Sequence, residues 1–308
     1  MPPSIRPAAH AEPTRRGLLR GALGLGTLGF AALTGCATPP EAPSGPQASP
    51  TPAAPPPPNP AASPSATPPP AAAAVMTRAE AVAKYRGRKP GQFGLDVPGI
   101  QLGLPRGSKA AALSFDACGG PGGTSFDRAL IKALRDADAP ATLFVNQRWA
   151  RANRGLLADL SADPLFEIAN HGTSHAPLGV AGQEAYGIPG TASVGQAYDE
   201  IMGNQRYLAG EFGLDARFFR SGTAHMDQIG AELCRDLGLV PMNFTVNLDA
   251  GATFAASVVA AQLGGLRAGD VGIGHFNRPD SGTAAGVRKG LKTLQDAGVE
   301  LVRLSQAW

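Results

Sequence analysis

Short apolar runs alternate with longer amphipathic ones from about residue 110 to the C-terminus. The short runs predict buried strands, and apolar positions at helical spacing between them, as in 125–136 and 194–212, predict helices. The strands are expected at about 110–116, 141–146, 165–170, 217–220, 240–247, 270–275 and 299–304. Strands that alternate with helices form a parallel sheet covered by helices, so the pattern predicts one α/β domain, most simply a closed or nearly closed barrel.

The first 35 residues follow a different pattern, which is typical of export. Arg15 and Arg16 precede an apolar, glycine-rich run at 21–33 that is too short to span a bilayer as a helix. A twin arginine ahead of such a run predicts a signal peptide of the twin-arginine type. The run ends in LTGC, which resembles a bacterial lipobox with Cys36 as the lipidated new N-terminus. The alternative is a free or buried cysteine that follows small residues.

Residues 36–75 form a second distinct segment. From 37 to 74 the chain is almost wholly Pro, Ala, Ser and Thr, and Glu41 is its only charge. Such a composition offers little apolar surface to bury and predicts a disordered tether. The folded domain is therefore expected at 76–308, anchored through lipid on the outer side of the cytoplasmic membrane or in the periplasm.

The net charge of +3 does not indicate a nucleic-acid partner. The excess lies in the predicted leader, where arginines outnumber the one acidic residue, and the chain from Cys36 onward is formally neutral. Because binding to nucleic acid rests on a basic surface, we expect no such partner.

Polar side chains gather at one end of the predicted barrel. Each lies at the carboxyl end of a predicted strand or directly after it; they are Asp116, Asn146, His171, His175, Arg220, Asn247, Asp249 and His275. In parallel barrels these strand ends and the loops after them carry the chemistry. The sequence therefore predicts a functional site at this rim.

His171 and His175 are four residues apart and can both reach one metal ion. A carboxylate from a neighbouring strand would complete a set of two histidines and one carboxylate that is open to water and substrate. The alternative is a pair of hydrogen-bonded structural histidines at a strand end. The pair does not form the zincin motif, because Gly172 stands where that motif has a glutamate.

Six stretches, in order, resemble the motifs of polysaccharide deacetylases of the NodB-homology class, carbohydrate esterase family 4. They are AALSFDA, ATLFVN, EIANHGTSH, FFRSGT, VNLDAG and GDVGIGH, and they cover about 110–304. The resemblance implies a distorted seven-stranded (β/α) barrel. It also implies metal-dependent removal of acetyl groups from a polysaccharide such as peptidoglycan, a chitin-like polymer or an exopolysaccharide.

The same resemblance implies a role for individual residues. Asp116 corresponds to the general base, Arg220 to the arginine that orients it, and His275 to the general acid. The two histidines of EIANHGTSH correspond to metal ligands, and the backbone amide of Thr223 to an oxyanion donor. The implied ion is zinc, with cobalt or manganese as alternatives.

The first motif departs from the family at the metal. The family's second aspartate, normally a ligand, is Ala117 here. Asp116, Cys118, Asn146 or additional waters could complete the ligand set. We favour Asp116, since its carboxylate is the only one at that strand end and a metal favours its ionised form.

The arginine motif also departs from the family, and the residue that orients His275 is open. Ser221-Gly222-Thr223 replaces the usual proline and aromatic, and His225 close by could compensate. Either Asn247 or Asp249 could orient His275, and we include Asp249 among the site residues. A turn residue at the strand end is the alternative for both.

Two cysteines remain in the expected domain. Cys118 and Cys234 could pair in an oxidising compartment, or Cys234 could be a small core residue on a helix. Cys118 opens a glycine-rich run at 118–123 that lacks the Lys-Ser/Thr pair of a phosphate loop. The segment 176–191, which contains Tyr186, is long enough to be a substrate-facing loop.

Two functions of different classes are therefore expected. The first is an exported, lipid-anchored, metal-dependent deacetylase of a cell-envelope or extracellular polysaccharide. The alternative is a catalytically weak or inactive barrel that binds acetylated glycan, which Ala117 and the altered arginine motif would explain. The retention of Asp116, Arg220 and His275 favours the enzyme.

Overall fold

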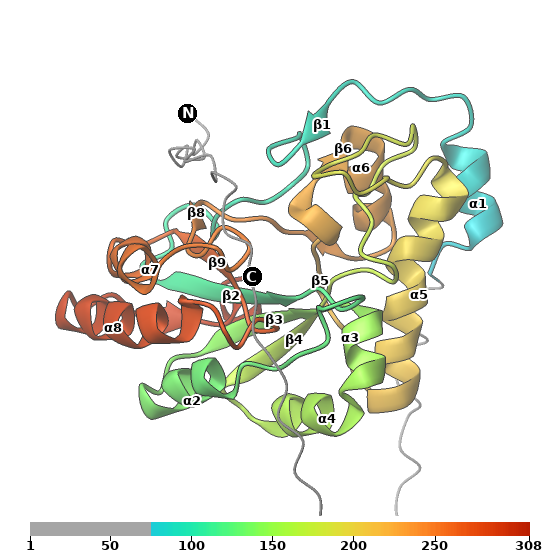
Figure 1. Ribbon diagram of the computed structural model, residues 1–308. Coiled ribbons are helices and arrows are strands. Elements are labelled where there is room, and N and C mark those ends of the chain that lie inside the picture. Colours follow the sequence, from blue (N-terminus) through green and yellow to red (C-terminus); the bar gives the residue numbers. More distant parts are fainter. Residues whose placement is uncertain (1–74) are drawn as a thin grey trace, which may run out of the picture. The chain divides into compact units, whose positions relative to one another are not determined.

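The computed structural model describes residues 75–308 (Figure 1). The predicted signal peptide at 1–35, the lipidation site Cys36 and all but the last residue of the tether at 36–75 lie outside the described residues. In the described part of the chain no helix is long and apolar enough to cross a membrane.

A curled parallel sheet forms the centre of the domain. Its main path runs in the order β7 (Val240–Pro241), β5 (Phe218–Phe219), β4 (Phe166–Asn170), β3 (Ala141–Val145), β2 (Ala111–Ala117), β9 (Val271–His275) and β8 (Val246–Asn247). An eighth strand, β10 (Leu301–Val302), pairs with the start of β2. The predicted distorted seven-stranded (β/α) barrel is confirmed.

The predicted strand at 240–247 is two strands, and the barrel is interrupted between them. β7 pairs with β5 and β8 pairs with β9, so the two edges of the sheet are joined by the short segment 242–245. The carbonyl groups of Met242 and Asn243 accept hydrogen bonds from the Arg220 side chain. In a continuous strand these carbonyls would accept hydrogen bonds from a neighbouring strand. Here they accept hydrogen bonds from the guanidinium instead.

Helices cover the outside of the sheet (Figure 1). They are α1 (Arg78–Lys84), α2 (Arg128–Asp136), α3 (Gln147–Ala152), α4 (Arg154–Ala162), α5 (Val194–Phe212), α6 (Gln228–Asp236), α7 (Ala256–Gly264) and α8 (Thr283–Asp296). The predicted helix at 194–212 has the same bounds as α5. α2 begins at Arg128 rather than Ser125, because the Asp127 side chain caps it by accepting the N–H of Leu130.

The alternation of side chains along β2 separates the packed core from the site. Leu113, Phe115 and Ala117 are fully buried in the cluster between the sheet and its helices. Ser114 and Asp116 point the other way and contact Arg220. Because successive strand residues face opposite sides, this register places the carboxylate inside the barrel rim.

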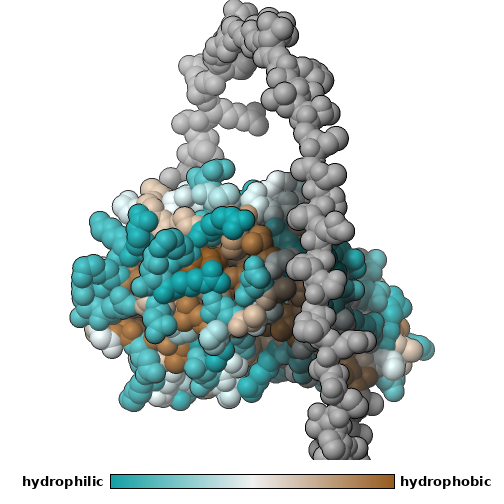
Figure 2. Space-filling model, turned by 90° about the horizontal axis from the view of Figure 1, so that it is seen from below, coloured by the Kyte–Doolittle hydropathy of each residue, from teal (hydrophilic) through white to brown (hydrophobic). Residues whose placement is uncertain are grey.

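One face of the described residues is largely polar (Figure 2). Viewed from below, it shows hydrophilic side chains with smaller apolar areas between them (Figure 2). The large hydrophobic residues that stand exposed within the described range are Val75, Tyr186 and Val258. Tyr186 is 79% exposed and lies at the rim that carries the candidate site.

Gly286 allows α7 and α8 to pack closely, since a Cβ there would lie 2.4 Å from the Cβ of Val259. We expect Gly286→Ala to lower the free energy of unfolding by about 1–3 kcal/mol through overpacking. Gly210 in α5 is the matched control, because an added Cβ meets nothing within 4 Å. Gly210→Ala should raise stability by about 0.5–1 kcal/mol. Urea titrations measure both changes in the free energy of unfolding. Changes of the same sign in the two variants would contradict this close packing.

Candidate active site

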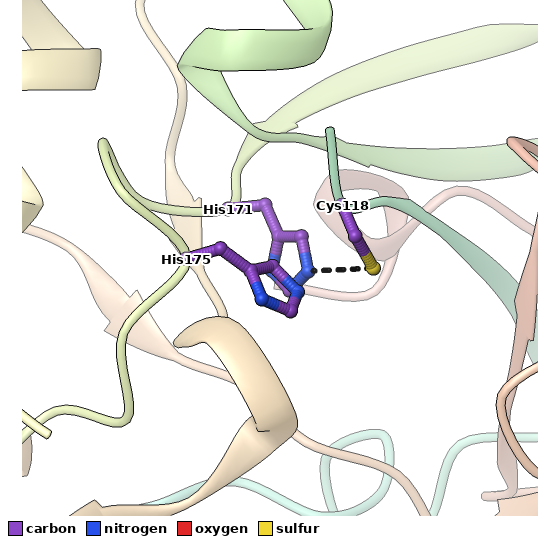
Figure 3. Close-up of side chains that lie close together, drawn as sticks. All are labelled: Cys118, His171 and His175. Atoms are coloured by element: carbon purple, nitrogen blue, oxygen red, sulfur yellow. Dashed lines mark hydrogen bonds between the residues drawn. The ribbon is translucent and has the colours of Figure 1, made fainter. Parts of the chain in front are cut away.

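The carboxyl ends of the strands bring most of the predicted site residues together. Asp116 is the second-last residue of β2, His171 follows β4, Arg220 follows β5 and His275 closes β9. His175 lies in the loop after β4, and its ring packs edge-to-face with that of His171 (Figure 3). The rim predicted from the sequence is therefore one place in the structure.

Asp116 and Arg220 form a buried ion pair. Nη1 of Arg220 donates to Oδ1 of Asp116 at 2.7 Å, and both side chains are shielded from solvent. Burial alone would raise the pKa of Asp116, but the Arg220 charge and the His171 ring outweigh burial, so its pKa lies below the ordinary value. Oδ2 is not held by Arg220 and lies 3.5 Å from Nε2 of His171.

Nε and Nη2 of the Arg220 guanidinium also have hydrogen-bond partners. Nε donates to the carbonyl of Met242 at 3.1 Å, and Nη2 donates to Oγ of Ser114 at 3.0 Å and to the carbonyl of Asn243 at 2.9 Å. Its planar face lies 4.0 Å from the centre of the Phe144 ring. The arginine is therefore rigid and can hold Asp116 in one orientation.

His171 is held in one tautomer. Its Nδ1 lies 2.9 Å from the carbonyl oxygen of Arg220, which can only accept a hydrogen bond, so Nδ1 carries the proton. In the neutral ring Nε2 then carries the free lone pair, and it lies 3.9 Å from Sγ of Cys118. A ring nitrogen fixed by a carbonyl on its other side is the usual arrangement of a metal-binding histidine.

His175 is positioned by backbone contacts. It adopts a left-handed φ of 66°, and its ring is nearly perpendicular to that of His171, with 4.9 Å between the centroids. A Cβ on Gly222 would lie 2.1 Å from the carbonyl oxygen of His175. The glycine in the altered arginine motif therefore lets the two loops touch.

Three donor side chains could hold a metal ion. A sulfur or ring nitrogen from each of Cys118, His171 and His175 lies within 4.8 Å of the others (Figure 3). Within residues 75–308 Asp116 is not in this group, although its Oδ2 is near His171, and its predicted role as a ligand stays a prediction. Cys118 and Cys234 are both free, and Cys234 is buried in α6.

Asn146 does not face this cluster with its side-chain oxygen. Nδ2 donates to the carbonyls of His171 and Gly172 at 3.0 and 2.8 Å, and Oδ1 accepts the N–H of Arg148 at the start of α3. The side chain thus fixes the loop that carries the first histidine.

Glu200 is a positioning residue that the sequence analysis missed. Its carboxylate accepts the backbone N–H of Ser174 and of Ala176, the residues that flank His175, and also the hydroxyl of Ser174. Glu200 is buried in α5 beside Ala197 and Ile201. A charged residue on the buried stripe of a predicted helix is the signal that could have found it.

His275 is paired with Asp249. Nδ1 of His275 lies 2.9 Å from Oδ1 of Asp249, and Oδ2 accepts the backbone N–H of His275 at 2.7 Å. Burial lowers and the Asp249 charge raises the pKa of His275, and the charge prevails, so this pKa lies well above its ordinary value. Asn247, the other candidate, accepts the N–H of Ala250 in a turn. Asp249 is therefore the residue that orients His275.

Thr223 and His225 border the site at the edge of the barrel. Thr223 has a left-handed φ of 66°, and its carbonyl accepts a hydrogen bond from Nδ1 of His225 at 2.8 Å. The His225 ring contacts Tyr186 edge-on at 5.3 Å between centroids, and Phe93 in a tilted arrangement at 5.6 Å. The predicted loop at 176–191 contains no helix or regular strand and brings Tyr186 to this rim.

Comparisons with known proteins concern the family and the fold. Residues 103–242 match the family model of polysaccharide deacetylases. No curated protein matches the chain in sequence. The fold is similar to a carbohydrate esterase family 4 pseudoenzyme from Bacillus anthracis, with 16% identity over 67% of each chain and a TM-score of 0.56.

Two further solved structures show the same likeness in fold. The peptidoglycan deacetylase PdaC from Bacillus subtilis has 20% identity and a TM-score of 0.52, over 65% of this chain and 90% of that one. A family 4 carbohydrate esterase from Streptomyces lividans in complex with acetate has 23% identity and a TM-score of 0.50, over 63% of this chain and 92% of that one.

The Glu200 carboxylate should support metal binding through the His175 loop. We expect Glu200→Ala to weaken zinc binding by about 10–100-fold, as is typical for a residue that orients a ligand. Asp199→Ala is the matched control, because the neighbouring Asp199 is exposed and pairs with Arg78 at the surface. Competition with a chromogenic chelator measures both affinities, and circular dichroism checks folding. A folded Glu200→Ala protein with wild-type affinity would show that the loop is held without it.

Proposed function

This chain carries a polysaccharide deacetylase domain of the NodB-homology class, and from that premise we propose that the protein is a metal-dependent hydrolase that removes acetyl groups from a cell-envelope or extracellular polysaccharide. The observation that carries the proposal is the arrangement of two oriented proton-transfer groups around one cluster of metal donors. Asp116 is held by Arg220, and His275 is held by Asp249. The donor cluster of His171, His175 and Cys118 lies at the same rim.

Asp116 is suited to act as the base. Arg220 holds Oδ1 and keeps the carboxylate ionised, which leaves Oδ2 to accept a proton from the attacking water. The orientation of the carboxylate is set before substrate arrives, because the arginine itself is fixed by Ser114 and by two carbonyls.

His275 is suited to act as the acid. Asp249 binds Nδ1 and favours the protonated ring, so Nε2 can donate a proton to the nitrogen or oxygen that leaves the acetyl group. The water then becomes part of the acetate product, and the leaving group gains the proton. The backbone amide of Thr223 is proposed as a donor to the developing oxyanion.

The chemistry of the donor set fits a divalent metal ion. His171 presents a lone pair at Nε2 because its Nδ1 is committed to the Arg220 carbonyl, and His175 faces it. A bound zinc ion, or cobalt or manganese, would supply a Lewis acid that polarises the acetyl carbonyl and acidifies water. Asp116 and His275 would carry out the proton transfers.

The location of the substrate follows from the segment before the domain. A lipid on Cys36 and a tether at 36–75 would hold the domain close to the outer face of the cytoplasmic membrane or in the periplasm. Peptidoglycan and secreted polysaccharides lie within reach there. The structural similarity to a peptidoglycan deacetylase supports this substrate class. The exposed ring of Tyr186 offers an apolar face for a sugar at the rim.

A glycan-binding protein without hydrolytic activity is the second candidate. It is favoured by Ala117, which removes the family's third ligand, and by the similarity of the fold to a pseudoenzyme. The intact base and acid pairs favour hydrolysis, because glycan binding alone has no need of a buried Asp116–Arg220 pair.

Metal-dependent acetate release tests the proposed function directly. The purified protein, stripped with a chelator, should release no acetate from acetylated glycans, and zinc or cobalt should restore release. N-acetylated and O-acetylated substrates, assayed separately, identify the bond. His171→Ala should abolish both release and metal retention. Acetate release by the His171→Ala protein at the wild-type rate would rule out the metal mechanism, and glycan binding without release under any metal would favour the second candidate.

Asp249 should affect protonation of the leaving group rather than folding of the domain. We expect Asp249→Asn to reduce kcat on acetylated glycans by about 100-fold or more, since the oriented, protonated His275 is lost. The same variant should keep most of its activity on an aryl acetate, whose leaving group needs no proton. Asn247→Ala is the control from the same strand end and should leave both activities near wild type. Equal losses on both substrates would indicate a structural role for Asp249.

A further inference from the structure

We propose that the sulfur of Cys118 is the third protein ligand of the metal ion held by His171 and His175, in a site that selects soft divalent ions such as zinc and cobalt over manganese and magnesium. This inference rests on the proposed metal-dependent function and specifies how the site works without the family's second aspartate. It replaces the expectation that Asp116 completes the ligand set.

The geometry of the three donor atoms supports a shared ion. Donor atoms around a tetrahedral zinc lie about 3.3–3.6 Å apart, given Zn–N and Zn–S bonds of about 2.0–2.3 Å. Sγ of Cys118 lies 3.9 Å from Nε2 of His171, and all three donor atoms lie within 4.8 Å of one another. Small rotations of the side chains are enough to bring them onto one ion.

The register of β2 explains why residue 118 rather than 117 faces the ion. β2 continues through Ala117, which pairs with Val145 and is fully buried in the core between sheet and helices. Alternation along the strand places Cys118 on the same side as Asp116. The Ala117 side chain packs in that core, whereas the Cys118 side chain reaches toward the histidines.

The backbone after Cys118 is fixed by a closed turn. Gly119 has a left-handed φ of 67°, and its N–H donates to the carbonyl of Gly123 at 3.1 Å. A Cβ at Gly119 would lie 2.5 Å from the backbone nitrogen of Trp149 at the start of α3. The glycine-rich run therefore packs against α3 and holds the cysteine in place.

The carboxylates of Asp116 and Glu200 already have other partners. Oδ1 of Asp116 is bound by Arg220, and its Oδ2 is the atom the reaction needs as a base. Glu200 is bound to the backbone around His175. With three protein ligands, a fourth position stays open for water or substrate, as catalytic zinc sites require. A thiolate favours zinc and cobalt over hard oxygen-seeking ions.

Cobalt substitution of the purified full-length protein tests the sulfur ligand. The wild-type cobalt protein should show a near-ultraviolet sulfur-to-cobalt charge-transfer band, and Cys118→Ser should lack it. Cys234→Ala is the matched control, because Cys234 is buried in α6 away from the site, and it should keep the band. Cys118→Ser should also weaken zinc binding by more than about 100-fold, beyond the 10–100-fold typical of an outer residue that only orients a ligand.

A Cys118→Asp variant distinguishes a metal ligand from a residue that only lies near the ion. Cys118→Asp should retain cobalt with its visible bands but without the charge-transfer band, and should shift the preference of the site toward manganese. A wild-type cobalt protein without the band would overturn the proposal. So would a Cys118→Ser protein with unchanged zinc affinity, including one that loses acetate release, since the thiol would then act as a nucleophile instead.

The acetate assay distinguishes this inference from the proposed function. A charge-transfer band without acetate release from any glycan would support the sulfur ligand and remove the deacetylase function. Metal-dependent release without the band would support the deacetylase and overturn the sulfur ligand.

Discussion

The buried guanidinium of Arg220 is the group on which the barrel rim depends. It joins Asp116 at the end of β2 to the carbonyls of Met242 and Asn243, where the barrel is interrupted. The backbone carbonyl of Arg220 fixes the tautomer of His171. Removing one partner of such a buried pair leaves an uncompensated charge and typically costs about 3–5 kcal/mol. The same residue therefore supports the fold, the proposed base Asp116 and the candidate metal ligand His171.

A common arrangement recurs in the three groups that we propose to act at the site. Each has one polar atom tied to a fixed partner and another directed toward the reaction: Asp116 is held by Arg220, His171 by a backbone carbonyl and His275 by Asp249. These partners are themselves buried. Orientation is thus set by the folded chain before substrate binds, which lowers the reorganisation that the reaction requires.

The sequence predicted the periodic features of the structure well and the long-range contacts poorly. The strand ends at Asp116, His171, Arg220 and His275 were predictable because apolar runs mark strands, and parallel strands end at one rim. The split of 240–247 was not, because it depends on a side chain about 20 residues earlier that binds the carbonyls of the segment.

The choice between neighbouring positions was also beyond sequence reasoning. Whether Asn247 or Asp249 reaches His275 depends on a turn that only the folded chain defines. Whether Asp116 or Cys118 faces both histidines depends on how far β2 continues before its closing turn. A thiolate and a carboxylate carry the same charge, so the proposed move of the third ligand from position 117 to 118 would preserve the net charge of a divalent site with two neutral histidines. The charged pairs Asp116–Arg220 and Asp249–His275 lie beside that site and are each formally neutral. Glycan binding alone would not require burying these charges, whereas a reaction that moves one proton from water and another to a leaving group uses both pairs.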